Sequence, residues 1–356
     1  MKKLTLYVAS TVLYTSFIMI LALMAIFFIF TYIDQASDIG QGNYTALSAF
    51  LYVLYIAPFN IYLIMPVCAL LGALMGLGLL ANNSELIVMR ASGQSIFQIA
   101  KGVLLAAVIL GIITFITGAY IAPHFEKKAK VAKTIATGGN EALVLYDTES
   151  LWIKEKDSFI HVGRNQPNGP LQDITRFNVL DNKLISISHA QSARFENGHW
   201  RANNVSSTEI HDKSSTTTTE KSAVWDTLMP PSLLKIMASN TDYLNINQLA
   251  DYLHFSKDSQ QSNNRIALKF WQIIFQPVSL FILMLIAVPF SLGSMRSAAM
   301  GYKFVLGALF GFSFYIINQT FGPFSLVYNL PPLLGASIPS MIFAIVLCFM
   351  FWKMRE

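Results

Sequence analysis

The stretch that decides the fold is residues 8–33, VASTVLYTSFIMILALMAIFFIFTYI, which contains no charged side chain. As an α-helix it would be about 39 Å long, which exceeds the thickness of a membrane's hydrocarbon core, about 30 Å. We therefore expect a first transmembrane helix here. Lys2 and Lys3 before the run would also suit a signal peptide. The run is too long for one and lacks a small-residue cleavage pattern, so an uncleaved anchor is expected.

Five further apolar runs follow, at residues 50–81, 96–122, 271–290, 304–321 and 333–352. The chain of 356 residues is 54% hydrophobic and only 13% charged, whereas a soluble domain carries about 25% charged residues. Six spans place both termini on one side of the membrane. The basic residues of the short loops fall on that side: Lys2, Lys3, Arg90, Lys101, Arg296, Lys303, Lys353 and Arg355. By the positive-inside rule, we expect cytoplasmic termini.

A polar block from Glu126 to Lys269 interrupts the apolar chain and holds 17 of its 25 basic and 16 of its 20 acidic residues. It contains neither of the two cysteines, so no disulfide can hold it together. Its apolar residues tend to alternate, as in the stretches 143–146, 151–154, 159–162, 184–188 and 199–201. Such alternation predicts an all-β sandwich or roll. The orientation of the spans places this block on the extracytoplasmic side of the membrane.

Turn and linker signals subdivide this block. Asn197-Gly198 predicts a hairpin turn, and Asp181-Asn182 predicts a second turn. We expect residues 127–134 to continue the third span as a polar helix, and residues 246–255 to form a short amphipathic helix. The Ser- and Thr-rich stretch 206–222 is interpreted as a mobile loop.

Motifs of enzyme chemistry are missing from the sequence. It has no His-Glu-x-x-His pair, no Gly-x-Ser-x-Gly elbow and no phosphate-binding Gly-x-x-x-x-Gly-Lys-Ser/Thr loop. All six histidines lie outside the spans, and no long basic run suggests nucleic-acid binding. Charged residues are also missing from the span centres, which disfavours a proton-coupled transporter. We expect no catalytic residue, no metal and no cofactor, with ATP bound by a partner if transport is driven.

Small and aromatic residues are the features that the spans do carry. Gly72–Gly76 and Gly307–Gly311 have the spacing at which helix backbones approach closely, within one chain or between subunits. Pro58 and Pro66 predict a bend or cavity in the second span. Aromatic residues gather at the outer end of the first span, where they would grip acyl chains or form an ordinary interfacial belt: Phe27, Phe28, Phe30 and Tyr32.

The most informative short segment is the cytoplasmic loop at residues 84–93, SELIVMRASG. Ser84 is a candidate cap of a short helix that Gly93 would end. The apolar residues Leu86, Ile87 and Met89 cannot all face water beside Glu85 and Arg90. Such a helix docks on a protein partner or lies in the membrane interface, and the physics leaves both readings open.

At these residues the chain resembles the LptF/LptG permease family of the lipopolysaccharide export ABC transporter. The segments that carry the resemblance span the whole chain: Asp34-Gln35 with Gly40-Gln-Gly42, 69–78 (ALLGALMGLG), 84–93, Phe275-Gln-Pro277, and 321–332 (FGPFSLVYNLPP). The segment at 84–93 is shared by both branches of the family. The stretch at 321–332 favours the LptG branch.

This resemblance implies a permease that extracts lipopolysaccharide from the outer leaflet of a Gram-negative inner membrane and passes it to a periplasmic β-jellyroll bridge. The implied domains are residues 1–125 with spans 1–3, 126–269 as a periplasmic jellyroll-like β domain, and 270–356 with spans 4–6. Its implied partners are an LptF-like permease, an LptB-like ATPase dimer, an LptC-like single-span protein and an LptA-like bridge. The alternative is a membrane-anchored periplasmic scaffold that transports nothing, and a lipid-modifying enzyme is a third, weaker reading.

Two sets of candidate site residues follow from the resemblance. The ATPase-coupling set comprises Ser84, Glu85, Leu86, Met89 and Arg90. The lipid-cavity set, on the first and fifth spans, comprises Phe27, Phe30, Thr31, Tyr32, Asp34, Phe314 and Ile317. The family carries lysines suited to lipid phosphates near the outer ends of the first two spans, where this chain has Thr31, Ser37, Asp38 and Phe59. Direct phosphate binding at these four positions is therefore not expected, so the partner supplies the charge or the substrate differs.

Overall fold

The computed structural model describes residues 2–139, 151–155, 158–164, 170–180, 183–196, 199–211, 214–225, 231, 234, 236, 239–259, 264–292 and 300–353. The predicted strand at 143–146 and the basic residues Arg296 and Arg355 lie outside these residues. The chain divides into two compact units. One comprises residues 1–40, 44–129 and 267–356, and the other comprises residues 41–43 and 130–266.

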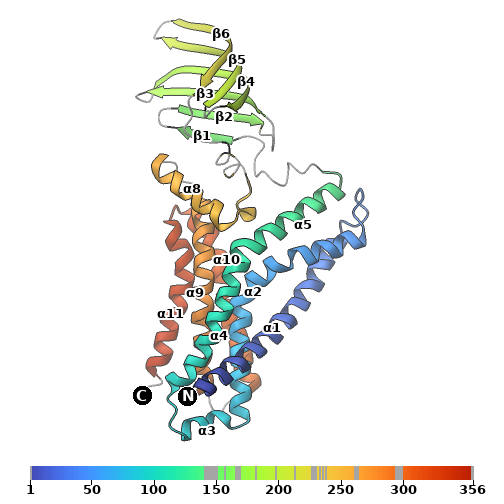
Figure 1. Ribbon diagram of the computed structural model, residues 1–356, viewed down its shortest axis with the longest axis vertical. Helices are drawn as coiled ribbons and strands as arrows, with labels where there is room; N and C mark the ends of the chain where they lie inside the picture. The colour runs from blue at the N-terminus through green and yellow to red at the C-terminus, as the bar shows by residue number, and fades with distance from the viewer. Residues whose placement is uncertain are drawn as a thin grey trace. The chain divides into compact units, whose positions relative to one another are not determined.

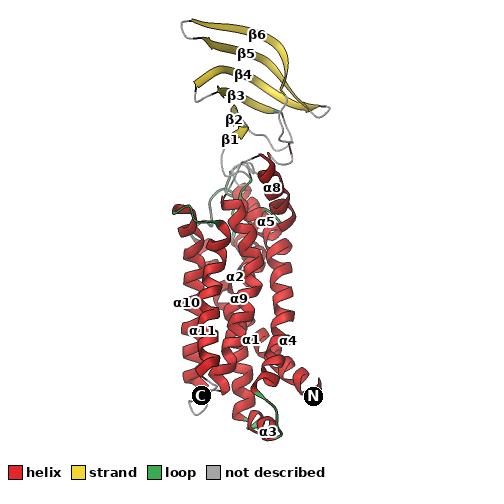
Figure 2. Ribbon diagram, turned by 90° about the vertical axis from the view of Figure 1, so that its left-hand side faces the viewer, coloured by secondary structure: helices red, strands yellow, loops and turns green. Residues whose placement is uncertain are grey.

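The first unit contains the predicted spans, which run beside one another in a bundle (Figures 1 and 2). The helices are α1 (Lys2–Ala36), α2 (Ala46–Asn82), α4 (Ile96–Ile116), α9 (Asn264–Leu292), α10 (Met300–Val327) and α11 (Pro332–Lys353). A short helix, α3 (Glu85–Ala91), connects α2 to α4. Among the described residues, six helices are long and apolar enough to cross a membrane. Helices suit this environment because a helix satisfies its own backbone hydrogen bonds in lipid.

The third span continues beyond the predicted end at residue 122. After α4 comes a π-helical turn, η1 (Thr117–Ile121), and then α5 (Ala122–Ala136), which includes the polar helix predicted at 127–134. The π turn places Gly118 against the ring of Tyr62 on α2, where a Cβ would overlap the ring. The small residue therefore lets α2 and the third span approach closely.

Helix α2 lies between α1 and α10. Gly72 and Gly76 face Ser16 and Thr15 of α1, and the Thr15 hydroxyl donates a hydrogen bond to the Gly72 carbonyl over 2.7 Å. Gly307 and Gly311 of α10 face other side chains of α2, Leu74 and Val67. Both glycine pairs thus serve packing within the chain, which is the first of the two readings that the sequence left open.

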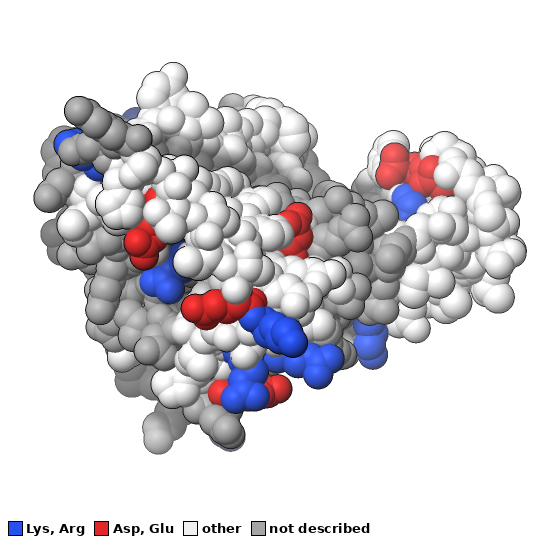
Figure 3. Space-filling model, turned by 90° about the horizontal axis from the view of Figure 1, so that it is seen from above, with Lys and Arg blue, Asp and Glu red and all other residues white. Residues whose placement is uncertain are grey.

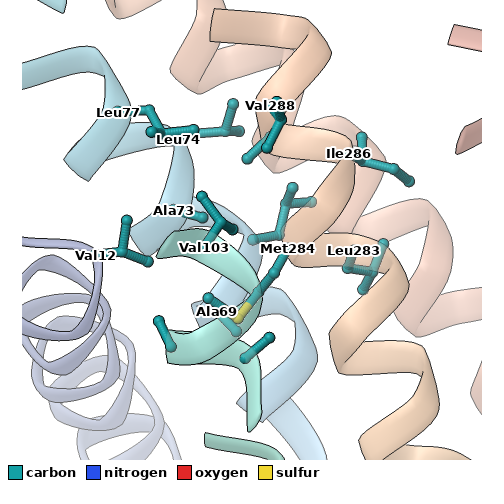
Figure 4. Packing of buried hydrophobic residues seen from close by; sticks show 14 of the residues in the cluster. Val12, Ala69, Ala73, Leu74, Leu77, Val103, Leu283, Met284, Ile286 and Val288 are labelled. Carbon is teal, nitrogen blue, oxygen red and sulfur yellow. The ribbon is translucent and has the colours of Figure 1, made fainter. Parts of the chain in front are cut away.

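The core of the bundle is built where α1, α2, α4 and α9 meet (Figure 4). Alanines of α2 alternate with larger aliphatic side chains there, so the helices interdigitate. Fully buried members include Val12, Ala69, Ala73, Leu77, Val103, Met284 and Val288.

The loop between α1 and α2 explains the first segment of the resemblance. Tyr44 is buried, and its hydroxyl donates a hydrogen bond to the Gln35 Oε1 over 3.3 Å. Burial raises the pKa of Tyr44 to about 12. Gly42 has φ +54°, and a Cβ there would lie 2.8 Å from the carbonyl oxygen of Ala136 at the end of α5. Glycine is required at this turn on both grounds.

The second unit contains an antiparallel sheet. Its described strands are β1 (Leu151–Glu155), β2 (Ser158–Arg164), β3 (Leu171–Leu180), β4 (Lys183–Glu196), β5 (His199–His211) and β6 (Ser214–Trp225). Each pairs with its sequence neighbours in the order β1-β2-β3-β4-β5-β6. The all-β fold inserted between spans 3 and 4 is confirmed. The described strands form one meander layer, without the crossover connections of a jelly roll among them.

The residues of both predicted turns, 181–182 and 197–198, lie outside the described residues, but the pairing of the flanking strands agrees with a short turn at each place. Leu180 pairs with Lys183 and Glu196 pairs with His199, so only two residues connect the strands at each place. The amphipathic helix predicted at 246–255 is confirmed as α8 (Ile246–Ser259), which a short 3-10 turn, η2 (Thr241–Tyr243), precedes. On the face in Figure 3, acidic and basic side chains lie next to one another, as the charge balance of the polar block leads one to expect.

The prediction of a mobile loop at 206–222 is wrong. Its described residues, 206–211 and 214–222, lie in β5 and β6, where Thr208 pairs with Thr217 and their hydroxyls are 3.1 Å apart. Threonine is β-branched and favours strands, and its hydroxyl bonds across to the neighbouring strand. The polar composition therefore reflects an exposed outer strand rather than a loop.

Candidate functional site: the α3 helix and the lipid-facing helices

The end of α3 is fixed by Gly93. This residue has φ +86°, and its N–H donates to the Arg90 carbonyl over 3.0 Å. The N–H of Gln94 donates to the Met89 carbonyl over 3.1 Å, which completes a Schellman motif. The predicted helix end at Gly93 is confirmed.

The start of α3 differs from the prediction. Ser84 occupies the N-cap position, but its φ is +59° and its side chain makes no capping hydrogen bond. A side-chain cap requires an extended backbone at this position, which Ser84 does not have. Ser95, before α4, does have it (φ −75°, ψ 157°) and forms a full capping box with Gln98. The spacing Ser-x-x-Gln at residues 95–98 is the sequence signal for this cap.

The two faces of α3 have different surroundings. Leu86 and Met89 are 3% and 6% exposed and belong to the core cluster of the bundle. Ile87 and Val88 are 46% and 65% exposed. Leu86 and Met89 therefore anchor the helix, while its free apolar surface comes from Ile87 and Val88. Val88 is not among the residues predicted for this site.

Charges of α3 are placed to suit its ends. Glu85 is in the first turn, half-buried, and accepts a hydrogen bond from the Asn83 amide over 3.4 Å. Arg90 is in the last turn and exposed. An acid at the first turn and a base at the last both favour the helix dipole. The site is thus an anchored short helix that presents two aliphatic side chains and one guanidinium.

The lipid-cavity candidates of α1 lie on one stretch of its outer end. Phe30 is 68% exposed, and Asp34 is exposed beside it, one helical turn on. Phe27, Thr31 and Tyr32 are half-buried. Ile29 and Ile33, at 58% and 61% exposed, extend the same apolar surface. The structure brings these residues together as a largely apolar strip on one helix.

The candidates of α10 are placed differently. Phe314 is 2% exposed, and its ring packs edge to face on Phe343 with centroids 5.3 Å apart. Ile317 is half-buried against the core cluster. The exposed apolar residues of α10 include Val305, Leu309, Phe312 and Ile316. Since α2 lies between α1 and α10, the two groups of candidates occupy different sides of it.

A lysine that sequence reasoning missed lies near Phe59, one of the four positions at which the resemblance leads one to expect a basic residue. The Nζ of Lys269, on α9, lies 6.0 Å from the centroid of the Phe59 ring on α2. No sequence signal joins residues 59 and 269, because only the packing of α9 against α2 brings them together. Phe59 therefore has a cation close to it.

The second unit has an apolar row across its sheet. Val162 pairs with Ile174, Ile174 with Ala190, and Ala190 with Val205, and all four side chains are buried. Directly paired residues share one face of a sheet, so the row is continuous across four strands. Within the described residues, no group of three or more His, Cys, Asp or Glu is placed to hold a metal ion.

Comparison with known proteins gives consistent results. Residues 6–353 match the family model described as lipopolysaccharide export system permease LptF/LptG. The chain is 36% identical over 344 residues to the lipopolysaccharide export system permease protein LptG of Escherichia coli K12, covering 96% of this chain and 95% of the relative. It is 31% identical over 353 residues to the Haemophilus influenzae protein of the same name, covering 98% of both chains.

Proposed function

The chain belongs to the LptF/LptG family of lipopolysaccharide export permeases, and on this premise we propose that it extracts lipopolysaccharide from the outer leaflet and passes it to its β unit. It is a multi-pass inner-membrane protein and a transport permease rather than an enzyme. From the β unit the lipid would continue to a periplasmic bridge. The termini and α3 then face the cytoplasm, and the β unit faces the periplasm.

The observation that carries this proposal is the outward face of α3. A seven-residue helix between two spans is anchored by Leu86 and Met89, yet it leaves Val88 65% exposed. Exposed aliphatic side chains on a short, fixed helix suit a hydrophobic groove of a partner protein. The partner proposed is an ATPase, because the chain itself has no phosphate-binding loop. Glu85 and Arg90 would set the register of the docked helix.

The cargo imposes a physical requirement on the surfaces along its path. An acyl chain of about a dozen methylenes costs about 10 kcal/mol to expose to water, at about 0.8 kcal/mol per methylene. A transport path that exposes the acyl chains to water is therefore excluded. The exposed apolar strip of α1 supplies apolar surface in the first unit. In the second unit the row from Val162 to Val205 is apolar but buried, so it would have to be uncovered to receive an acyl chain.

The position of Lys269 favours a contact between its ammonium group and a lipid phosphate. The resemblance implies basic residues where this chain has Thr31, Ser37, Asp38 and Phe59, and the ammonium of Lys269 lies 6.0 Å from the centroid of the Phe59 ring. We propose that this lysine supplies a positive charge at that level of α2. The wider assembly proposed is a heterodimer with an LptF-like permease, an LptB-like ATPase dimer, an LptC-like single-span protein and an LptA-like bridge.

A matched pair of valines tests the coupling role. Val88→Asp in α3 and Val224→Asp in β6 introduce the same charge at side chains that are 65% and 62% exposed. Val88→Asp is expected to lower the amount of ATPase that co-purifies with the chain by about tenfold, since an interface centre does not tolerate an unpaired charge. Glu85→Lys should reduce it as well. Equal co-purification of ATPase with Val88→Asp and Val224→Asp would contradict the coupling role.

Photocrosslinking separates the transporter from a scaffold. A photoreactive residue at Tyr32 or Ile317 should capture lipopolysaccharide, whereas one at Ile345 of α11, 70% exposed, should capture only phospholipid. Capture of lipopolysaccharide at neither Tyr32 nor Ile317 would favour the scaffold.

A further inference from the structure

Helix α2 contains a proline at its buried centre. Pro66 has no backbone N–H, so the carbonyl of Tyr62, four residues earlier, loses its bond within the helix. In a membrane, a freed carbonyl of this kind needs another donor, because water is not at hand to replace it. The question is which side chain supplies that donor.

Gln276 of α9 supplies it. Its Nε2 donates a hydrogen bond to the Tyr62 carbonyl over 3.2 Å and lies 3.5 Å from the carbonyl oxygen of Leu63. Gln276 is only 5% exposed. It is also the centre of the segment Phe275-Gln-Pro277, to which the proposed function assigns no role. The side chain of one helix thus replaces the backbone donor that another helix lacks.

The same side chain reaches a third helix. The Nδ2 of Asn318, on α10, donates to the Oε1 of Gln276 over 3.4 Å. The ring of Tyr62 packs on Gly118 in the π turn of the third span. We call the set Tyr62, Pro66, Gln276 and Asn318 the Pro66 joint. Three helices meet there through hydrogen bonds and a fourth through packing.

The joint lies between two parts of the chain with proposed roles. On the C-terminal side of Pro66, α2 runs on to the short connection that leads into α3. On α10, Asn318 of the joint is the residue next to the lipid-cavity candidate Ile317. Proline sites are where helices bend most readily. We propose that Gln276 is a positioning residue that holds α2 at Pro66 and links it to α10, so that displacement of α3 reaches α10. This inference rests on the proposed function, in which an ATPase moves α3.

The test compares lipid release per ATP with stability in the full complex. The chain is assembled with its partner subunits in proteoliposomes, and lipopolysaccharide released to a soluble acceptor is measured per ATP hydrolysed. For Gln276→Leu we expect about a tenfold lower ratio, which corresponds to about 1.4 kcal/mol, together with a lower melting temperature. In the double variant Gln276→Leu with Pro66→Ala, the restored N–H at position 66 bonds to the Tyr62 carbonyl. The melting temperature should therefore recover, while the amount of lipopolysaccharide released per ATP stays low.

Two further variants keep the inference testable. Asn318→Leu cuts only the link to α10 and should lower the ratio without a comparable loss of melting temperature, even if Gln276→Leu fails to assemble. Ser340→Ala is the matched control, because it removes another hydrogen bond between spans, the 2.6 Å contact of Ser279 with Ser340. Ser279 keeps its bond to the Phe275 carbonyl, so this variant should retain the wild-type ratio.

The outcomes separate the joint from the transport role. A wild-type ratio in Gln276→Leu or in Asn318→Leu, or a double variant that melts no higher than Gln276→Leu, would overturn the joint alone. A wild-type complex that hydrolyses ATP without releasing lipopolysaccharide would overturn the proposed function and the joint with it.

Discussion

Substitution of Gly72 by alanine tests how closely α1 and α2 must approach. A Cβ at this position would overlap the backbone Cα and the Oγ of Ser16 and lie 2.7 Å from its Cβ, whereas ordinary contact begins at 3.4 Å. Because a backbone atom cannot rotate away, α1 would have to move by about 1 Å. The Thr15 hydroxyl would then lose its 2.7 Å bond to the Gly72 carbonyl.

The expected cost follows from these contacts. Overpacking costs about 1–3 kcal/mol. The lost hydrogen bond between spans adds about 0.6 kcal/mol, and the higher helix propensity of alanine returns about 0.5–1 kcal/mol. We therefore expect a net loss of about 1–3 kcal/mol in the free energy of unfolding, or several degrees in melting temperature at about 2–4 °C per kcal/mol.

The assay is thermal unfolding in detergent, followed by tryptophan fluorescence at one scan rate because membrane proteins often unfold irreversibly. Gly301→Ala is the matched control, since Gly301 is helical and a Cβ there would meet nothing within 4 Å. The control should melt at or slightly above the wild type. Equal melting temperatures for Gly72→Ala and Gly301→Ala would refute the close approach of α1 and α2.

Three further predictions concern single side chains. Ser84→Gly should slow hydrogen exchange of the α3 amides, because φ +59° costs about 1 kcal/mol at a residue other than glycine; faster exchange would contradict this. Tyr44→Phe should reduce the loss of stability between pH 10 and 12: with its folded pKa raised to about 12, Tyr44 contributes stability that is present below pH 10 and lost as the pH rises. A pH profile identical to the wild type would exclude this role for Tyr44. Lys269→Met should weaken lipopolysaccharide binding by the isolated permease pair and make it less sensitive to salt, and unchanged salt dependence would show that the lysine does not contact a phosphate.

The spans and the hairpin turns were predictable because each depends on local chemistry. The length and hydropathy of residues 8–33 leave a membrane helix as the only structure that satisfies its backbone. Asn197-Gly198 favours a two-residue turn because both residues tolerate positive φ, and Glu196 indeed pairs with His199.

What could not be predicted depends on neighbours distant in sequence. Ser- and Thr-rich residues 206–222 are typical of a loop until strand pairing is known. The apolar residues of α3 lie all around a seven-residue helix, so only the packed bundle shows that Leu86 faces inward and Val88 outward. The bond from Gln276 to the Tyr62 carbonyl joins residues more than two hundred positions apart, and Pro66 predicted only a bend or cavity in the second span.

Release of lipopolysaccharide from proteoliposomes tests the proposed role most directly. The complete complex is reconstituted with lipopolysaccharide, and its transfer to a soluble periplasmic acceptor is measured with and without ATP. The proposal predicts ATP-dependent transfer that is lost when this chain is left out and greatly reduced in Val88→Asp. Transfer that persists without this chain, or ATP hydrolysis by the intact complex with no transfer, would contradict it.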